Sequence, residues 1–211
     1  MSQETWEILC EMEADDVELQ LALQCAPLIT GLKISNLLTI SPEGFTQVGR
    51  IVESSVLSLY PLLETEEKMV ILLYREDRLE KYLKMPQVQK LLREAGYESD
   101  RLEDILPVFC DRYETYAERG KPFPHELGLL LGYPPEDVEG FIIYEGKNSL
   151  CEGYWKVYAE PQKKLRLFAQ YDKAREWLLD LLYCGVGMED IVGVALDAES
   201  RAISQDYLFA S

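Results

Sequence analysis

Candidate catalytic residues lie where a helix is expected to begin. Pro124 is typical of the first position of a helix, so His125 and Glu126 fall in its first turn. Free backbone N–H groups and the positive end of the helix dipole lie there, which suits an anion. An imidazole beside a carboxylate is also the minimum for general acid–base catalysis. His125 and Glu126 are therefore the candidate catalytic pair. Structural roles would also explain them, with Glu126 complementing the dipole and His125 packing under Phe123 or capping a neighbouring segment.

A closed zinc site is not expected. The His-Glu-Leu-Gly run lacks the second histidine that a zinc-protease helix carries one turn later, since Leu129 occupies that position. His125 is the only histidine, and the five cysteines are widely spaced with no Cys-x-x-Cys pair. No metal ligands are therefore assigned. A looser metal or haem site made by His125, Glu126 and a thiol such as Cys25 or Cys151 stays open as an alternative.

Candidate ligand-binding residues lie on or beside predicted strands. They are three cations and two phenols: Lys33, Arg75, Tyr154, Lys156 and Tyr158. The last three share one face of an alternating stretch. If that strand neighbours the strand that Arg75 ends, one sheet surface presents phenols and cations together. Such a surface can hold an anionic or planar ligand. The alternative is an amphipathic face that a helix covers, with Lys156 reaching water.

The charge balance excludes some partners. The chain has 21 Lys and Arg against 38 Asp and Glu, a net charge of −17, which repels nucleic-acid phosphates and anionic lipids. No apolar run approaches the roughly 20 residues that span a bilayer. The acidic N-terminal stretch lacks the basic and apolar parts of a signal peptide. We therefore expect a cytoplasmic protein whose partner is another protein or a small anionic ligand, not nucleic acid or membrane. The oligomeric state stays open.

The order of elements predicts an α+β fold, rich in helix, with a small sheet of about three strands covered by helices. Strands are expected at 32–40, 69–74 and 153–159. Helices are expected at 16–25, 42–59, 77–83, 86–95, 99–116, 124–131, 135–145, 161–184 and 188–196. Pro27 is expected to end the first helix, and Pro107 to kink or divide the fifth.

The length of 211 residues fits one main domain. We expect this α+β domain at residues 16–185. An acidic N-terminal extension at 1–15 precedes it, and a C-terminal helix and tail at 186–211 follow it.

Several of these segments resemble an uncharacterised domain family found mainly in anaerobic Gram-positive bacteria. The resemblance runs from about residue 20 to residue 183. The most specific parts are a Pro-His-Glu-Leu-Gly run, then Leu-Gly-Tyr-Pro, Asp-Val-Glu-Gly-Phe-Ile and Gly-Tyr-Trp-Lys-Val-Tyr. The segments that carry it are 25–33, 72–75, 123–134, 137–142 and 153–158. The family has no assigned activity, so the resemblance implies no particular chemistry or cofactor.

Three functions fit these observations. The first is a binding or regulatory protein without catalysis, in keeping with the high acidity and the 13 tyrosines. The second is an enzyme that uses His125 and Glu126 as an acid–base pair on a small anionic substrate. The third is a protein that handles a metal or haem. Any site is expected where the Pro124 helix start meets the stretch 153–158. A pocket that joins His125 to Tyr154, Lys156 or Lys33 would favour ligand binding or catalysis.

Overall fold

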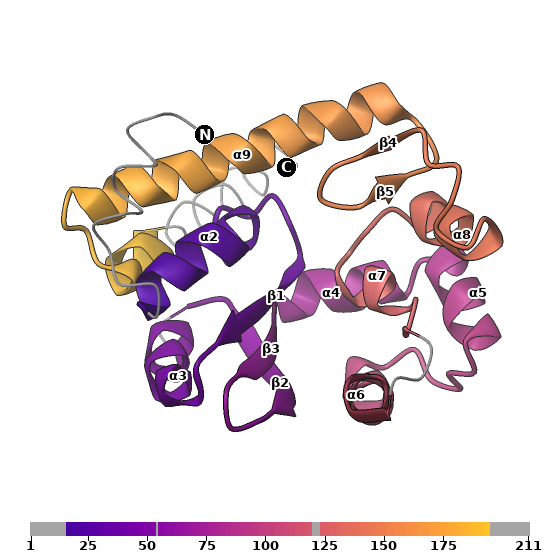
Figure 1. Ribbon diagram of the computed structural model, residues 1–211, viewed down its shortest axis with the longest axis horizontal. Helices are drawn as coiled ribbons and strands as arrows, with labels where there is room; N and C mark the ends of the chain where they lie inside the picture. Colours follow the sequence, from indigo (N-terminus) through magenta and orange to yellow (C-terminus); the bar gives the residue numbers. More distant parts are fainter. Residues whose placement is uncertain (1–15, 54, 120–122, 195–211) are drawn as a thin grey trace, which may run out of the picture.

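The computed structural model of the chain describes residues 16–53, 55–119 and 123–194. Its helices are α2 (Val17–Ile29), α3 (Phe45–Glu53), α4 (Glu76–Leu83), α5 (Pro86–Glu94), α6 (Leu102–Arg119), α7 (Leu127–Leu130), α8 (Pro135–Ile143) and α9 (Pro161–Tyr183), with a 3-10 turn η1 (Pro42–Gly44). Its strands are β1 (Ser35–Ile40), β2 (Ser58–Glu64), β3 (Met69–Tyr74), β4 (Cys151–Glu152) and β5 (Lys156–Val157). A further helical segment runs from residue 188 to 194, where the described part ends. Figure 1 shows the helix-rich α+β arrangement that the sequence predicts.

The main sheet has the strand order β1-β3-β2, and both strand pairs are antiparallel. The central strand β3 is the apolar run Met-Val-Ile-Leu-Leu-Tyr, and all six of its residues are buried. Such a strand needs cover on both faces. Its odd and even residues point to opposite faces, so Ile71 and Leu73 join one apolar cluster while Leu72 and Tyr74 join another. The sheet therefore separates two cores.

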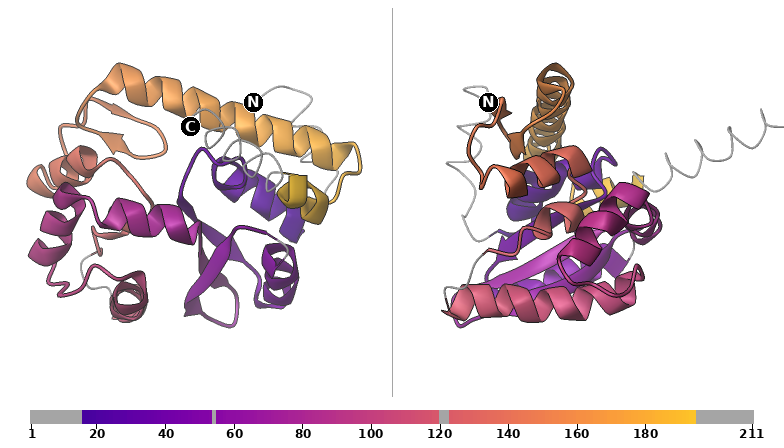
Figure 2. Two further views of the ribbon diagram at one scale, coloured as in Figure 1. Left: turned by 180° about the vertical axis from the view of Figure 1, so that it is seen from behind. Right: turned by 90° about the vertical axis from the view of Figure 1, so that its right-hand side faces the viewer.

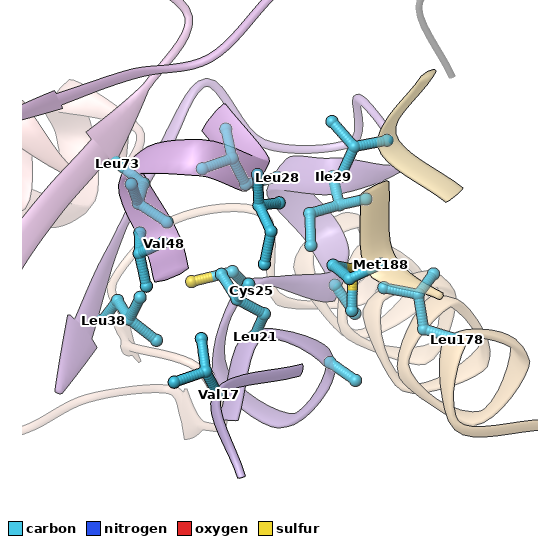
Figure 3. Close-up of a cluster of buried hydrophobic side chains, with 14 of the residues drawn as sticks. Val17, Leu21, Cys25, Leu28, Ile29, Leu38, Val48, Leu73, Leu178 and Met188 are labelled. Atoms are coloured by element: carbon cyan, nitrogen blue, oxygen red, sulfur yellow. The ribbon is translucent and has the colours of Figure 1, made fainter. Parts of the chain in front are cut away.

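The first core lies between the sheet and α2, α3 and the C-terminal half of α9. Figure 3 shows Cys25 and Leu28 of α2 in this cluster with Leu38 and Leu73 of the sheet. The second core lies on the other face, under α4, α5, α6, α7 and α8. A third, small cluster lies where the N-terminal half of α9 covers the β4–β5 hairpin. The long helix α9 therefore bridges the hairpin and α2, as Figures 1 and 2 show.

The third strand of the main sheet differs from the one expected. The stretch 153–159 does not join this sheet; the third strand is β2. The helix expected to continue to Leu59 ends at Glu53. Pro61 in β2 has no N–H to donate, so it suits only an edge strand. β2 is an edge strand, and its register against β3 shifts between Pro61 and Leu63. Pairing with the buried β3 decides the conformation here, against the apolar stripe that predicts a helix.

Two prolines lie inside helices, where the sequence predicts a break at Pro27 and a kink or a division at Pro107. α2 continues past Pro27 to Ile29, and α6 is one helix of 18 residues through Pro107. A proline inside a helix costs about 3 kcal/mol. Around Pro27 the residues Cys25 to Ile29 are all buried, and burial of a face supplies most of a helix's stability in a folded protein. Packing therefore outweighs the local break at α2.

The C-terminal end of α2 is closed by Arg75, which follows β3. The last carbonyls of a helix have no partner within the helix. The Arg75 guanidinium donates to the Leu28 carbonyl from Nε (3.3 Å) and Nη2 (3.1 Å), and from Nη2 also to the Ile29 carbonyl (3.1 Å). Arg75 is 2% exposed. It therefore joins α2 to the sheet by buried, charge-assisted hydrogen bonds.

Replacing Arg75 by methionine tests this role. Arg75→Met keeps an apolar stem but removes the guanidinium from the carbonyls of Leu28 and Ile29, of which Leu28 keeps a hydrogen bond from the Gly31 N–H (3.0 Å). We expect the free energy of unfolding to fall by about 3 kcal/mol. Urea denaturation measures the change, with Arg50→Met on the exposed face of α3 as the control expected to stay within about 0.5 kcal/mol of the wild type. Equal midpoints for the two variants would contradict the role.

Candidate functional site

A cavity of about 360 Å³ lies where α7, α8 and the β4–β5 hairpin meet. In Figure 1 these elements lie together beside the N-terminal part of α9. The lining side chains are mostly apolar or aromatic: Phe123, His125, Leu127, Gly128, Leu131, Tyr133, Asp137, Val138, Phe141, Tyr154, Trp155 and Lys156. The structure therefore brings His125 together with Tyr154 and Lys156, at the place where the sequence locates any site.

Aromatic rings form the walls of this cavity. The Trp155 indole stacks on the Tyr133 ring, with 4.7 Å between centroids, and meets the Phe168 ring edge-on at 4.6 Å. On the other side the His125 ring lies between the rings of Phe123 (6.0 Å) and Phe141 (5.3 Å). Rings held by other rings keep their orientation. The cavity therefore presents flat apolar surfaces that are already in place.

The Asp137 carboxylate holds the hairpin against α8. Its Oδ1 accepts from the backbone N–H groups of Tyr158 (2.8 Å) and Ala159 (3.0 Å), and its Oδ2 accepts from the Trp155 indole N–H (2.8 Å). Asp137 is 2% exposed, and the buried Lys164 ammonium lies 3.8 Å from Oδ2. A buried charge needs such compensation. Asp137 therefore fixes the position of Trp155.

The two candidate catalytic residues point to different places. His125 is exposed and lines the cavity, where its ring makes no hydrogen bond to any described residue. Glu126 is buried and does not line the cavity. Its Oε1 accepts from Arg112 Nη1 (2.8 Å) and from the Tyr97 hydroxyl (3.2 Å), while the Arg112 guanidinium lies 4.6 Å from the Tyr97 ring centroid. Burial raises the pKa of Tyr97, so it stays a neutral donor. The Glu126 side chain is thus part of a buried network.

The helix start expected at Pro124 is a turn. The Leu127 N–H bonds the Pro124 carbonyl (3.0 Å), and the Gly128 N–H bonds the His125 carbonyl (3.1 Å). α7 then covers four residues, less than the expected eight. Its end is as predicted, because Gly132 has φ +67° and closes the turn in the left-handed region. A helix of one turn has only a small dipole to offer an anion.

The hairpin also differs from its prediction. Only Lys156 and Val157 of the expected strand 153–159 are paired, and their partners are Cys151 and Glu152 in a separate sheet. Because the hairpin turn contains Tyr154 and Trp155, three consecutive side chains, 154–156, line the cavity instead of alternating. Since β5 and β3 belong to different sheets, no sheet face is shared with Arg75.

The remaining candidate residues lie outside the cavity. Arg75 closes α2. Tyr158 packs on α8, its ring stacked on Tyr144 at 5.8 Å, and its buried hydroxyl has no hydrogen-bond partner among the described residues. Lys33 lies behind the cavity wall, its ammonium 5.3 Å from the ring centroid of Tyr133.

Lys33 is a buried amine in a polar cluster below β1. It is 6% exposed, and Nζ donates to the Asn36 side-chain carbonyl. Burial lowers the pKa of Lys33 to about 8, and the nearby Cys25 thiol opposes this shift. Burial also raises the pKa of Cys25 to about 12, against a weaker lowering by Asn36 and Lys33.

The four cysteines that the structure describes take no part in the cavity. Among the described cysteines, Cys25 is buried in the first core and Cys151 lies beside the third cluster, and neither lines the cavity. Within the described residues no group of three or more His, Cys, Asp or Glu is placed to hold a metal ion. Cys10, the acidic extension 1–15 and the tail from residue 195 lie outside the described part. No described helix is both long enough and apolar enough to cross a bilayer.

Fold and cavity together define a helix-rich α+β protein with an aromatic-walled pocket. Residues 21–192 match the model of the family described as "Protein of unknown function (DUF3793)", and the chain belongs to that family. The match confirms the resemblance to an uncharacterised family and extends beyond residue 183 into the helical segment that starts at residue 188. No curated protein and no solved structure matches the chain.

Four important wall residues are absent from the candidates that the sequence suggests: Tyr133, Asp137, Phe141 and Trp155. Asp137 reads as an ordinary acid in the first turn of a helix, and its role depends on contacts 18 to 22 positions away. The sequence does contain a signal for these wall residues. Aromatic residues are dense before and after the loop that joins α8 to the hairpin.

Gly140 allows α8 and the hairpin to meet, and a substitution tests this. A Cβ at Gly140 would lie 2.5 Å from Cβ and Cγ of Tyr158, whereas a Cβ at Gly49 of α3 meets nothing within 4 Å. Both glycines are helical. We expect Gly140→Ala to lower the free energy of unfolding by about 2 kcal/mol, and Gly49→Ala to raise it by about 0.5–1 kcal/mol. Thermal unfolding compares the two. If both substitutions raise the free energy of unfolding, the contact between Gly140 and Tyr158 is loose.

The pKa of Lys33 predicts a rise in stability with pH. Its folded pKa of about 8 is below the ordinary 10.5, so the folded chain binds fewer protons than the unfolded chain between these values, and stability increases there. Above its ordinary pKa of 9, Cys25 has the opposite effect and lowers stability as the pH rises.

Between pH 8 and 9 we therefore expect the unfolding free energy of the wild type to rise relative to Lys33→Met, by at most about 1.4 kcal/mol. Urea denaturation at both pH values measures this. Lys147→Met, at an exposed lysine, should follow the wild type, and a constant difference between wild type and Lys33→Met would refute the prediction.

Proposed function

We propose that this chain is a binding protein for a small molecule with a ring system, acting without catalysis. The observation that supports it is the cavity of about 360 Å³ with aromatic walls. Binding sites for small molecules are typically cavities of some 300–1,000 Å³ with apolar walls and a few polar groups. This cavity is in that range and has that composition.

The polar atoms of the wall are largely committed to the protein. The Tyr133 hydroxyl donates to the Tyr154 carbonyl (3.3 Å), and the Tyr154 hydroxyl is bonded to Asp172 (3.0 Å) and to Arg175. Asp137 accepts three hydrogen bonds. These groups therefore hold the wall in place, and contact with the rings is the main source of affinity available to a ligand.

The acid–base hypothesis has less support in this geometry. It requires a carboxylate beside His125, whereas Glu126 is bonded to Arg112 and Tyr97 away from the cavity. Asp137, the one carboxylate that described residues contribute to the wall, already accepts from three donors. Binding is therefore the better-supported function.

The metal or haem hypothesis has less support for a similar reason. It pairs His125 with a cysteine, and no described cysteine lines the cavity. A protein partner and a cytoplasmic location remain predictions from the sequence.

A neutral fluorescent probe tests the proposal. 6-Propionyl-2-dimethylaminonaphthalene, which brightens in apolar surroundings, should bind saturably with one site per chain. Phe141→Ala removes one wall ring and should weaken binding about 10-fold, the equivalent of about 1.4 kcal/mol. Tyr144→Ala, at an exposed ring of the same segment outside the cavity, is the matched control and should leave the affinity unchanged. Absence of saturable binding by the wild type at millimolar probe would disprove the proposal.

A further inference from the structure

We infer that the ligand of this cavity is a planar aromatic molecule with one carboxylate or similar anionic group, placed between His125 and Lys156. The inference rests on the proposed binding function and adds the chemical class of the ligand. The planar part follows from the walls, since the indole of Trp155 and the rings of Phe141 and Tyr133 line the cavity. Flat ligands make the largest contact with such walls.

The anionic group follows from which hydrogen-bonding capacity is unused. The His125 imidazole has no hydrogen-bond partner among the described residues, and an imidazole can donate from either ring nitrogen, depending on its tautomer. The Lys156 ammonium donates to the Gly146 carbonyl (2.8 Å) and faces Glu152 Oε1 at 3.5 Å. An ammonium has three N–H groups, so one remains. Both free groups can donate, and both line the cavity.

The carboxylates of Asp137 in the wall and of the neighbouring Glu126, by contrast, are already used. Both Asp137 oxygens accept hydrogen bonds, and the Lys164 ammonium offsets its charge from 3.8 Å. Glu126 is turned toward Arg112. A ligand that offers only donors would therefore find no free carboxylate and at most one acceptor nitrogen, on His125, whereas a ligand acceptor finds a donor on each of His125 and Lys156. A charged acceptor forms the stronger hydrogen bonds.

The negative charge of the chain does not prevent this. Glu152 is the acidic group nearest Lys156 in the hairpin, and its side chain is 63% exposed. Exposed ion pairs contribute at most about 1 kcal/mol, so a ligand carboxylate can replace Glu152 beside Lys156 at small cost. The net charge of −17 on the whole chain acts over long distance and is screened at physiological salt.

Two ligands of the same shape separate the contribution of the anionic group to the affinity from that of the ring. We would titrate the wild type with 2-naphthoate and with the neutral 2-naphthamide in 150 mM salt, by calorimetry. We expect the naphthoate to bind at least 10-fold more tightly. His125→Phe keeps a ring between Phe123 and Phe141, and Lys156→Met keeps the apolar stem. Each variant should weaken naphthoate binding 5- to 10-fold and change naphthamide binding less than 2-fold.

The outcomes are distinguishable. Lys147→Met removes an exposed cation of the neighbouring loop that does not line the cavity, and it should change neither affinity.

Equal affinity of the wild type for the two ligands, or equal losses for both ligands in the variants, would overturn the anionic assignment while leaving the binding function intact. Binding of neither ligand at millimolar concentration would instead overturn the binding function itself. Thermal unfolding of each variant shows that it is folded, and because His125 and Lys156 act independently, either variant alone tests the inference.

Discussion

The arrangement of the cavity depends on one buried carboxylate, that of Asp137. Two backbone N–H groups and the Trp155 indole N–H converge on it. Each of these donors is removed from much of its water and would lose free energy without an acceptor. Only a group with two oxygens in that position satisfies all three. The hairpin therefore has one favourable position against α8, and the flat wall of the cavity is a consequence of that position.

The helix α9 connects this wall to the centre of the molecule. Its Phe168 ring supports the Trp155 indole edge-on, and Tyr171 lies beside it. Two turns and more along the same helix, Leu178 packs in the first core with α2. A helix this long transmits position because its backbone hydrogen bonds, apart from those of its end turns, are internal. The wall of the cavity is thus fixed by the same packing that stabilises the main sheet.

Sequence patterns succeed here where local preference and burial agree. The apolar run of β3 predicts a strand with its observed ends. Gly96 and Gly132, which directly follow the helices expected at 86–95 and 124–131, have the left-handed φ typical of helix ends, +85° and +67°. The patterns fail where long-range contacts decide. Pro27 predicts a break that burial of α2 overrides, and β2 takes its form from pairing with β3. Neither the burial nor the pairing is visible within a short window of sequence.

The candidate site likewise has parts that the sequence indicates and parts that only long-range contacts decide. His125 and Lys156 could be selected from their residue types, since each is a polar group near predicted turns and strands. That they share a cavity depends on the hairpin turn, which places three consecutive side chains on one side. Asp137 illustrates the deeper limit: in the sequence its carboxylate suits the first turn of α8, and an isolated helix would hold it equally well there. Its acceptance of an indole N–H 18 residues away arises only after the chain folds. A buried apolar residue of similar size would also fill the space, but it would leave the indole N–H without an acceptor. The orientation of the ring that a ligand would meet is therefore set by hydrogen bonding together with the rings of Tyr133 and Phe168.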